Sequence, residues 1–271
     1  MSKTASIPIF VLTALCCSCT PPTPTPTPTQ TTWYQDNDDD NYGDPATEFV
    51  GDQPDASWIA TAGDCDDSSA TINPDATETA DLVDQDCDGT VDNGFKYVFV
   101  TSAVYDGNLG GLAGADAKCQ AQSSSVGSIV PSGTYKAWIA TGDGDAPVDL
   151  HNHSTDSYVR PDGVTVAYAW GDLIDAQIVN PINTDQTGIL VQEYGRPDGN
   201  VMVWTNVQFD GDYNQPQAGE AGPFYDQCSG FIHNNNSDAA ITGSSTWTTS
   251  DWTDASVANC SDTAHLYCFQ Q

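Results

Sequence analysis

Residues 81–94 read DLVDQDCDGTVDNG, a stretch in which Asp84, Asp86 and Asp88 stand at every second position. Its acids and one glycine match positions 1, 3, 5, 6 and 9 of the EF-hand calcium loop, in the order Asp84, Asp86, Asp88, Gly89 and Asp92. A hard cation takes about six to eight oxygen ligands, and alternate side chains of a tightly curled loop converge on one such ion. Gly89 permits the sharp turn after the third carboxylate. The stretch therefore predicts a Ca²⁺ site.

This loop lacks one EF-hand ligand, because Phe95 stands where that motif has its bidentate glutamate. A ligand must therefore come from elsewhere in the chain. We predict that Asp64, Asp66 and Asp67 supply it. A disulfide between Cys65 and Cys87 would bring them alongside the loop. An earlier run repeats the alternating spacing with Asp36, Asp38 and Asp40. Both runs are candidate supporting ligands.

The acids are concentrated in residues 33–94, which hold 18 Asp and Glu and no Lys or Arg. One interpretation is a solvated acidic spacer. Against it stand the regular spacing, the cysteine pair and interleaved apolar residues such as Trp33, Phe49 and Trp58. So small a core does not offset about 1.5 kcal/mol of conformational entropy per residue, so we expect metal and disulfide to supply much of the stability. Without metal, carboxylate repulsion should loosen this module.

Three stretches resemble a bacterial metal-binding motif family, the MopE-type repeat: WYQDNDDDNYGDP (33–45), GDCDDSSATINPDATE (63–78) and DLVDQDCDGTVDNG (81–94). The sequence departs from the family at Gly51 and Ala80, where cysteines often stand, and at Asp39 and Asn41, which replace glycines of the first loop. The family is sometimes described as copper-binding. Its oxygen ligands favour calcium instead, because copper prefers nitrogen and sulfur.

Residues 1–19 predict a secretion signal, with Lys3 as its charged start and Ile7–Leu15 as its apolar stretch. A secreted bacterial lipoprotein has a cysteine directly after its cleavage point, and Cys19 fits that position best. Lipidation there leaves an even number of cysteines in the remainder of the chain. The alternatives are lipidation of Cys16 and a cleaved signal without lipid. We therefore expect an exported protein, held at the cell surface by a lipid or secreted.

Residues 20–32, TPPTPTPTPTQTT, predict an extended stalk, because proline at alternate positions fixes φ and favours polyproline II. At about 3.1 Å per residue it would span roughly 40 Å. The chain of 271 residues has a formal charge of −32. Such a charge argues against nucleic acid as a partner and against adhesion to anionic lipid. Contact with a membrane is expected only through the lipid anchor.

Residues 95–271 have the apolar content of a folded domain. β-branched and aromatic residues predict strands at 96–101, 136–140, 164–170, 201–204 and 266–269. Residues 111–120 predict a short helix that turns Cys119 toward the core. The connections are long, polar and rich in Asp, Asn, Gly and Thr. We therefore predict the α+β class, with a small calcium-loop module (33–94) followed by a disulfide-stapled extracellular recognition domain (95–271) with long loops.

The cysteines of this domain allow three pairings; they are Cys119, Cys228, Cys260 and Cys268. The stretch WTDASVANCSDTAHLYCF (252–269) resembles the C-terminal signature of C-type-lectin-like domains. The stretch VFVTSAVYDGNLGGLAGADAKCQA (98–121) resembles a bacterial family of unknown function grouped with that fold. The resemblance implies a C-type-lectin-like fold and the nested disulfides Cys119–Cys268 and Cys228–Cys260. It implies no activity.

Sugar-binding members of the lectin fold hold calcium with a Glu-Pro-Asn or Gln-Pro-Asp triplet and a Trp-Asn-Asp triplet. The corresponding segments here are QPQ (215–217) and WTD (252–254). Their good oxygen donors, with one neighbouring acid, are Gln215, Glu220 and Asp254. The site is therefore degraded or coincidental, and Trp252 is expected in the core. Calcium-dependent carbohydrate binding is an alternative function.

His151 and His153 would share one face of an extended segment, where two imidazoles can hold zinc or copper. With no third ligand in view, we expect them to be exposed loop histidines. An enzyme is not expected, because no Ser-His-Asp or Cys-His grouping is available when all cysteines are paired. We expect non-catalytic binding of an extracellular protein or glycan through the loops between about residues 143 and 245. A copper-scavenging or structural role at the surface is a further alternative.

Overall fold

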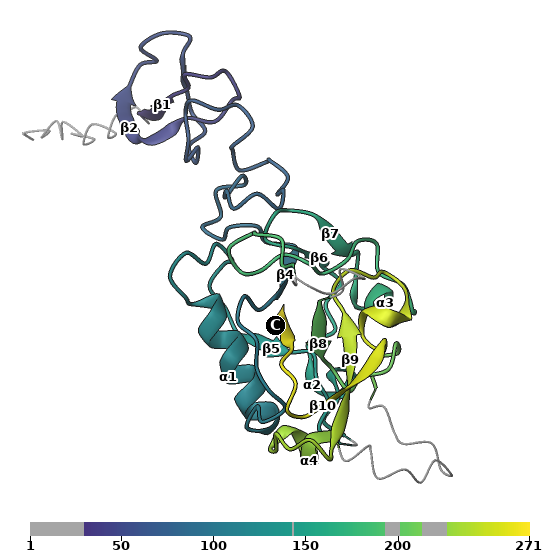
Figure 1. Cartoon of the computed structure of the whole chain (residues 1–271). Helices are drawn as coiled ribbons and strands as arrows, with labels where there is room; N and C mark the ends of the chain where they lie inside the picture. The colour runs from purple at the N-terminus through teal and green to yellow at the C-terminus, as the bar shows by residue number, and fades with distance from the viewer. Residues whose placement is uncertain (1–29, 143, 193–200, 213–226) are drawn as a thin grey trace, which may run out of the picture.

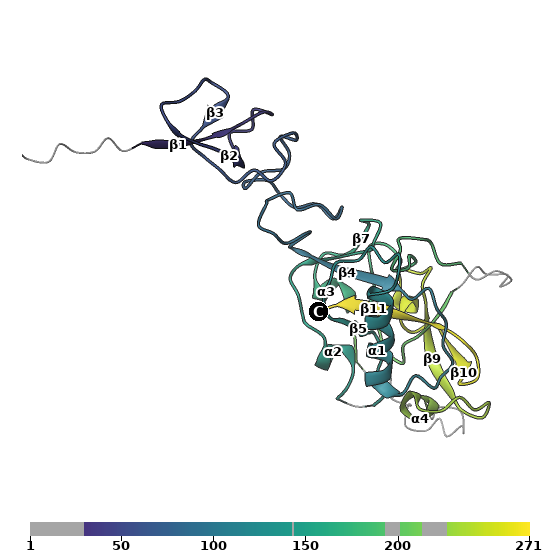
Figure 2. The same ribbon diagram turned by 90° about the vertical axis from the view of Figure 1, so that its left-hand side faces the viewer.

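The computed structural model describes residues 30–142, 144–192, 201–212 and 227–271. Cys19, Gln215 and Glu220 lie outside the described residues. In the described part of the chain, no helix is both long enough and apolar enough to cross a bilayer. A small N-terminal sheet and a run of loops lead into a larger C-terminal body (Figures 1 and 2).

The N-terminal sheet has the strand order β2-β1-β3. Its strands are β1 (Thr31–Gln35), β2 (Asp44–Gly51) and β3 (Trp58–Ile59), and β1 is antiparallel to both neighbours. Trp33 lies opposite Phe49, and the Phe49 and Trp58 rings meet edge to face, 6.0 Å between centroids. The interleaved aromatic residues therefore form a sheet that the sequence did not predict, and it begins two residues inside the predicted stalk. Residues 60–94 form loops and turns.

The C-terminal body is built on one mixed sheet, with eight strands among the described residues. In chain order they are β4 (Phe95–Val100), β5 (Tyr135–Ala137), β6 (Ser157–Val159), β7 (Thr165–Ala167), β8 (Met202–Trp204), β9 (Ala239–Ser244), β10 (Ser256–Asn259) and β11 (His265–Gln270). The sheet order is β10-β9-β8-β11-β4-β6-β7, with β5 also paired to β11. The first and last strands of the body, β4 and β11, are therefore antiparallel neighbours.

The helical segments are α1 (Gly111–Ser123), α2 (Pro147–Leu150), α3 (Trp170–Leu173), α4 (Gln227–Phe231) and the 3-10 turn η1 (Ser250–Trp252). Of these, only α1 is longer than five residues in the described chain. A mixed sheet with α1 and several shorter helical segments among the described residues fits the predicted α+β class.

Both faces of the central strands are buried. On β4, Tyr97 and Phe99 enter one apolar cluster, whereas Val98 and Val100 enter the other. This alternation arises because successive side chains of a strand point to opposite faces. Helix α1 covers the first face, and the second is covered by the short helices and loops that carry three buried tryptophans, Trp138, Trp170 and Trp252.

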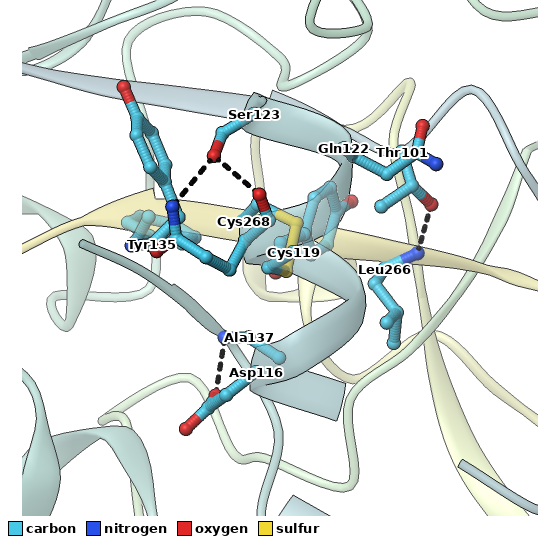
Figure 3. The surroundings of a disulfide bond; sticks show 12 residues. Thr101, Asp116, Cys119, Gln122, Ser123, Tyr135, Ala137, Leu266 and Cys268 are labelled. Atoms are coloured by element: carbon cyan, nitrogen blue, oxygen red, sulfur yellow. Dashed lines mark hydrogen bonds between the residues drawn. A yellow bond between two sulfur atoms is a disulfide. The ribbon is translucent and has the colours of Figure 1, made fainter. Parts of the chain in front are cut away.

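Helix α1 confirms the helix predicted at 111–120 and extends it to Ser123. Cys119 is fully buried and is bonded to Cys268 on β11. The Asp116 carboxylate accepts a hydrogen bond from the backbone NH of Ala137 on β5, at 2.9 Å. Figure 3 shows both links, which hold the helix across the central strands.

The structure contains the expected disulfides Cys65–Cys87, Cys119–Cys268 and Cys228–Cys260. The strands predicted at 96–101, 201–204 and 266–269 correspond to β4, β8 and β11. Two strand predictions are too long: β5 ends at Ala137, and β7 ends at Ala167, before Trp170 begins α3. Strands β6, β9 and β10 were not predicted, because small and polar residues dominate β9 and β10 and β6 has only three residues.

Candidate metal centre

The loop between β1 and β2 curls around Asp36. One carboxylate oxygen of Asp36 accepts a hydrogen bond from the backbone NH of Asp39 (2.8 Å), and the other accepts one from the NH of Asn41 (3.2 Å). Asp39 and Asn41 have φ values of 65° and 78°. Asn and Asp adopt this left-handed conformation more readily than most side-chain-bearing residues, so the loop forms without the glycines it would otherwise need. The curl brings the carboxylates of Asp36, Asp38 and Asp40 together.

This loop meets the segment after β3 to form a first acidic cluster of Asp36, Asp38, Asp40, Asp64 and Asp67. The cluster consists of two overlapping triads, Asp36–Asp38–Asp40 and Asp38–Asp64–Asp67. Within each triad, one oxygen from every carboxylate lies within 4.8 Å of the others. Asp38 belongs to both triads and lies at the junction. Two runs of acids that the sequence offered as separate supporting ligands therefore meet in space.

Several oxygens of the first acidic cluster are buried and have no hydrogen-bond partner among the described residues. They are both oxygens of Asp38, Oδ2 of Asp40 and Oδ2 of Asp64. The Asp64 residue is only 1 % exposed. Burial and the neighbouring Asp40 carboxylate raise the pKa of Asp38. Burial raises the pKa of Asp64 as well, with a further contribution from Asp40 and Asp38, although the NH of Asp66 donates to it.

A second acidic cluster contains Glu78, Asp84 and Asp86. Oε1 of Glu78 accepts hydrogen bonds from the NH groups of Gln85 (2.7 Å) and Asp86 (2.9 Å), which fixes the glutamate over the loop. Oδ2 of Asp84 accepts one from the NH of Gly89, whose φ is 89°. The remaining oxygens, Oε2 of Glu78 and Oδ1 of Asp84, are buried without a partner in the part of the chain that the structure describes.

The second acidic cluster differs from the predicted EF-hand set in its membership. The sequence did not identify Glu78, because it precedes the loop by several residues and has no place in the alternating pattern. Asp92 lies elsewhere: it is buried, and its oxygens accept hydrogen bonds from the NH groups of Asp81 and Leu82 and from the Tyr97 hydroxyl (2.5 Å). This carboxylate joins the loops to strand β4.

Two other predicted ligands also lie outside the acidic clusters found among the described residues. Asp88 accepts hydrogen bonds from the NH of Thr90 (2.7 Å) and the side-chain amide of Asn93 (2.6 Å). Asp66 is exposed and accepts a hydrogen bond from the Ser68 hydroxyl. Both carboxylates stabilise local turns of the module.

The Cys65–Cys87 disulfide links the segments that carry the two acidic clusters. Cys65 directly follows Asp64 of the first acidic cluster, and Cys87 directly follows Asp86 of the second. The two Cα atoms are 5.7 Å apart. The disulfide thus brings the acids around residue 64 alongside the loop at residue 84, as the sequence predicted. The acids near residue 64 and those of the loop at residue 84 lie in separate clusters, although the sequence predicted that they share one site.

The donor chemistry of the module is uniform. Residues 33–94 contain no Lys, Arg, His or Met, and both cysteines are oxidised. The available ligands are oxygens of carboxylates, side-chain amides, hydroxyls and the backbone, and they suit a hard divalent cation.

Residues 64–93 match a family model described as a putative metal-binding motif, named Cu-binding MopE. The motif contains all of the second acidic cluster, and of the first it contains only Asp64 and Asp67. It confirms the resemblance for the stretches at 63–78 and 81–94. The stretch at 33–45 lies outside the match. No curated protein matches the chain.

The histidine pair does not form a metal site. His151 is buried, which corrects the expectation of exposure, and its Nε2–H donates to the carbonyl of Ala137 at 3.0 Å. His153 is exposed and stacks on Trp170, 4.2 Å between ring centroids, with its Nε2 2.9 Å from the carbonyl of Val148. Each imidazole ring thus has its own carbonyl partner in the protein.

Among the candidate sugar-site residues, the structure describes Asp254. It follows η1, and its backbone NH donates to the carbonyl of Ser250 at 3.0 Å. Trp252 is fully buried and packs on Trp138, 5.0 Å between centroids. The expectation that Trp252 belongs to the core is confirmed.

Proposed function

We propose that the chain is an exported surface protein whose acidic module binds Ca²⁺ and presents a C-type-lectin-like domain to an extracellular protein or glycan. A lipid on Cys19 holds it at the membrane, and residues 20–30 act as the stalk. The C-terminal domain binds without catalysis. The Ca²⁺ contributes to the stability and rigidity of the module between the stalk and the domain.

The observation that carries the metal part of this proposal is the second acidic cluster. Glu78 and Asp84 each keep one buried oxygen for which the described residues offer no donor. Their other oxygens are occupied by backbone NH groups, so the carboxylates are already oriented. Burying an unpaired carboxylate is costly, and a bound cation removes that cost.

Calcium is favoured over copper by the ligand set. Copper prefers imidazole, thiolate and thioether ligands, and residues 33–94 supply none of these. Calcium accepts carboxylates in flexible geometry at about 2.3–2.6 Å, and more of them than the octahedral Mg²⁺ usually takes from a protein. Two carboxylates on the loop turned by Gly89, together with Glu78 from the preceding segment, suit that preference.

The lectin-like part of the proposal is supported by the arrangement of the C-terminal body. Its first and last strands, β4 and β11, are paired, and helix α1 is bonded to β11 through Cys119–Cys268. The Cys228–Cys260 disulfide links α4 to the residue after β10, and the chain between the two cysteines contains β9 and β10. This is the nested pattern that the resemblance implies.

The metal proposal is tested by calorimetric titration of the full-length oxidised chain with Ca²⁺, Mg²⁺ and Cu²⁺. We expect Ca²⁺ to bind most tightly. The double variant Glu78→Gln/Asp84→Asn should weaken binding at the second acidic cluster at least tenfold, equivalent to about 1.4 kcal/mol, because two charged ligands are lost.

The matched control is Asp52→Asn, which removes a charge from an exposed residue of the same module outside both acidic clusters. It should leave Ca²⁺ affinity within about twofold of the original. Unchanged Ca²⁺ binding in the double variant, or tighter binding of Cu²⁺ than of Ca²⁺, would contradict the proposal.

A further inference from the structure

We propose that the first acidic cluster binds a second divalent cation, which fastens the N-terminal sheet to the metal-binding motif. This inference rests on the proposed function of the module as a binder of hard cations. It concerns a different set of residues, three of which lie outside the matched motif, namely Asp36, Asp38 and Asp40.

The ligands come from two segments that the backbone already holds in register. The NH of Gly43 donates to the carbonyl of Thr61 (2.9 Å), and the NH groups of Gly63 and Asp64 donate to the carbonyl of Gly43 (3.2 and 3.3 Å). These hydrogen bonds pin the end of the β1–β2 loop to the residues that precede Asp67. They bring the two halves of the cluster side by side.

A second contact crosses the same junction. The backbone NH of Asn37 donates to Oδ1 of Asp67 at 2.7 Å, and the Asn37 side-chain amide donates to Oδ2. This pair orients Asp67 toward the loop. Because Asn37 lies between Asp36 and Asp38, the contact also fixes the loop at the point where its carboxylates converge.

The buried oxygens show that hydrogen bonds alone do not complete the cluster. Asp64 is 1 % exposed, and its Oδ2 has no donor within the described chain. Both oxygens of Asp38, at the junction of the two triads, are in the same situation. Residues 33–94 contain no basic side chain that could neutralise them. A divalent cation at the junction would give each of these oxygens a partner.

A cation in the first acidic cluster would strengthen the link between the N-terminal sheet and the metal-binding motif. The residues of the N-terminal sheet belong to neither apolar cluster of the C-terminal body, and residues 60–94 form loops and turns. An ion held between Asp38 and Asp64 would cross-link the sheet to the motif near the Cys65–Cys87 disulfide. An ion in the first acidic cluster would thus stabilise the attachment of the sheet to the motif, whereas an ion in the second acidic cluster would stabilise the motif itself.

The test combines Ca²⁺ stoichiometry with hydrogen–deuterium exchange on the full-length oxidised chain. Titration should give one more Ca²⁺ per chain in the original protein than in Asp38→Asn or Asp64→Asn. In the original protein, Ca²⁺ should slow exchange at residues 36–43 and 61–67 at least tenfold relative to EGTA. The Asp38→Asn and Asp64→Asn variants should lose that protection and keep the Ca²⁺ response at residues 78–89.

The matched control Asp52→Asn should behave like the original protein in both measurements. Unchanged stoichiometry in both cluster variants would overturn the inference. So would exchange at residues 36–43 of the original protein that Ca²⁺ does not alter, a result that needs no variant to fold. If either outcome occurs while Glu78→Gln/Asp84→Asn still weakens Ca²⁺ binding, this inference fails and the proposed function stands. If instead only Glu78→Gln/Asp84→Asn leaves Ca²⁺ binding unchanged, the proposed function fails.

Discussion

Individual carboxylates of the module have different roles according to the donors around them. Asp88 and Asp92 have both oxygens occupied by donors of the protein, so they stabilise the local structure. Asp38 and Asp64 keep buried oxygens that no described residue satisfies. The residue type is the same in all four cases. The local supply of NH and OH groups distinguishes a turn-forming aspartate from a candidate ligand.

His151 gives the C-terminal body a pH-dependent stability. Burial lowers its pKa from 6.5 to about 4, with Lys136 and His153 adding repulsion and the Ala137 carbonyl opposing the change. The unfolded chain therefore takes up a proton at this site below about pH 6.5, whereas the folded chain does not until about pH 4. Stability contributed by the neutral ring is present above pH 6.5 and is lost as the pH falls toward 4, by about 3 kcal/mol in total.

The measurement is urea unfolding at pH 7 and pH 4 in excess EGTA, followed by tryptophan fluorescence. His151→Asn should flatten the pH dependence by about that amount, and the exposed His153→Gln should not. Equal pH slopes in His151→Asn and the original chain would show that His151 titrates normally in the folded state.

At the scale of elements, helix α1 depends on a close approach to the segment before it. A Cβ on Gly114 would lie 2.1 Å from the carbonyl oxygen of Leu109, which also accepts a hydrogen bond from Lys118 (2.7 Å). The helix begins after Gly110, which has a φ of 84°. The start of α1 is therefore determined by backbone packing, and none of its first-turn residues is acidic.

Gly114→Ala tests this packing. Helix propensity alone predicts that alanine would stabilise the helix by about 1 kcal/mol. The steric conflict with Leu109 predicts the opposite sign, a loss of about 1–3 kcal/mol, measured by urea unfolding. Gly171→Ala in α3 is the control, because a Cβ there meets no atom within 4 Å. Stabilisation by Gly114→Ala would mean that α1 can shift away from the Leu109 carbonyl at little cost.

At the scale of the whole molecule, the metal-binding motif is part of the structure of the C-terminal body. Ala80 and Leu82 pack against the apolar cluster under α1, and the hydroxyl of Tyr97 on β4 reaches Asp92. A Cβ on Gly163, in the β6–β7 turn, would come within 2.6 Å of the Ala80 carbonyl oxygen. The motif therefore rests on the body at one end and joins the N-terminal sheet at the other.

Removing the Cys65–Cys87 disulfide should weaken Ca²⁺ binding. Cys65→Ser/Cys87→Ser releases a loop of 22 residues, worth about 3 kcal/mol in chain entropy, and frees the two acidic clusters from their common link. We expect calorimetry to show at least tenfold weaker Ca²⁺ binding. Cys228→Ser/Cys260→Ser removes a disulfide of the body and should leave Ca²⁺ affinity unchanged. Equal Ca²⁺ affinities in the two double variants would show that the clusters form without the cross-link.

Several features follow from the sequence alone because they depend on neighbouring residues. The turn at Gly89 comes from a glycine at the required position. The strands β4, β8 and β11 come from β-branched and aromatic runs, and α1 comes from apolar spacing. The disulfides of the C-terminal body were implied by a family resemblance rather than by local pattern.

Only the tertiary structure decided which carboxylates meet. Glu78 joins Asp84 because NH groups of residues 85 and 86 hold it there, and Asp38 joins Asp64 because the β1–β2 loop pairs with residues 61–64. Asp92 leaves the loop because Tyr97 and two backbone NH groups bind it. Period-two spacing predicts that acids can converge, but the partner of each oxygen depends on where the folded backbone places the surrounding NH and OH groups, and those positions are defined only after the chain folds.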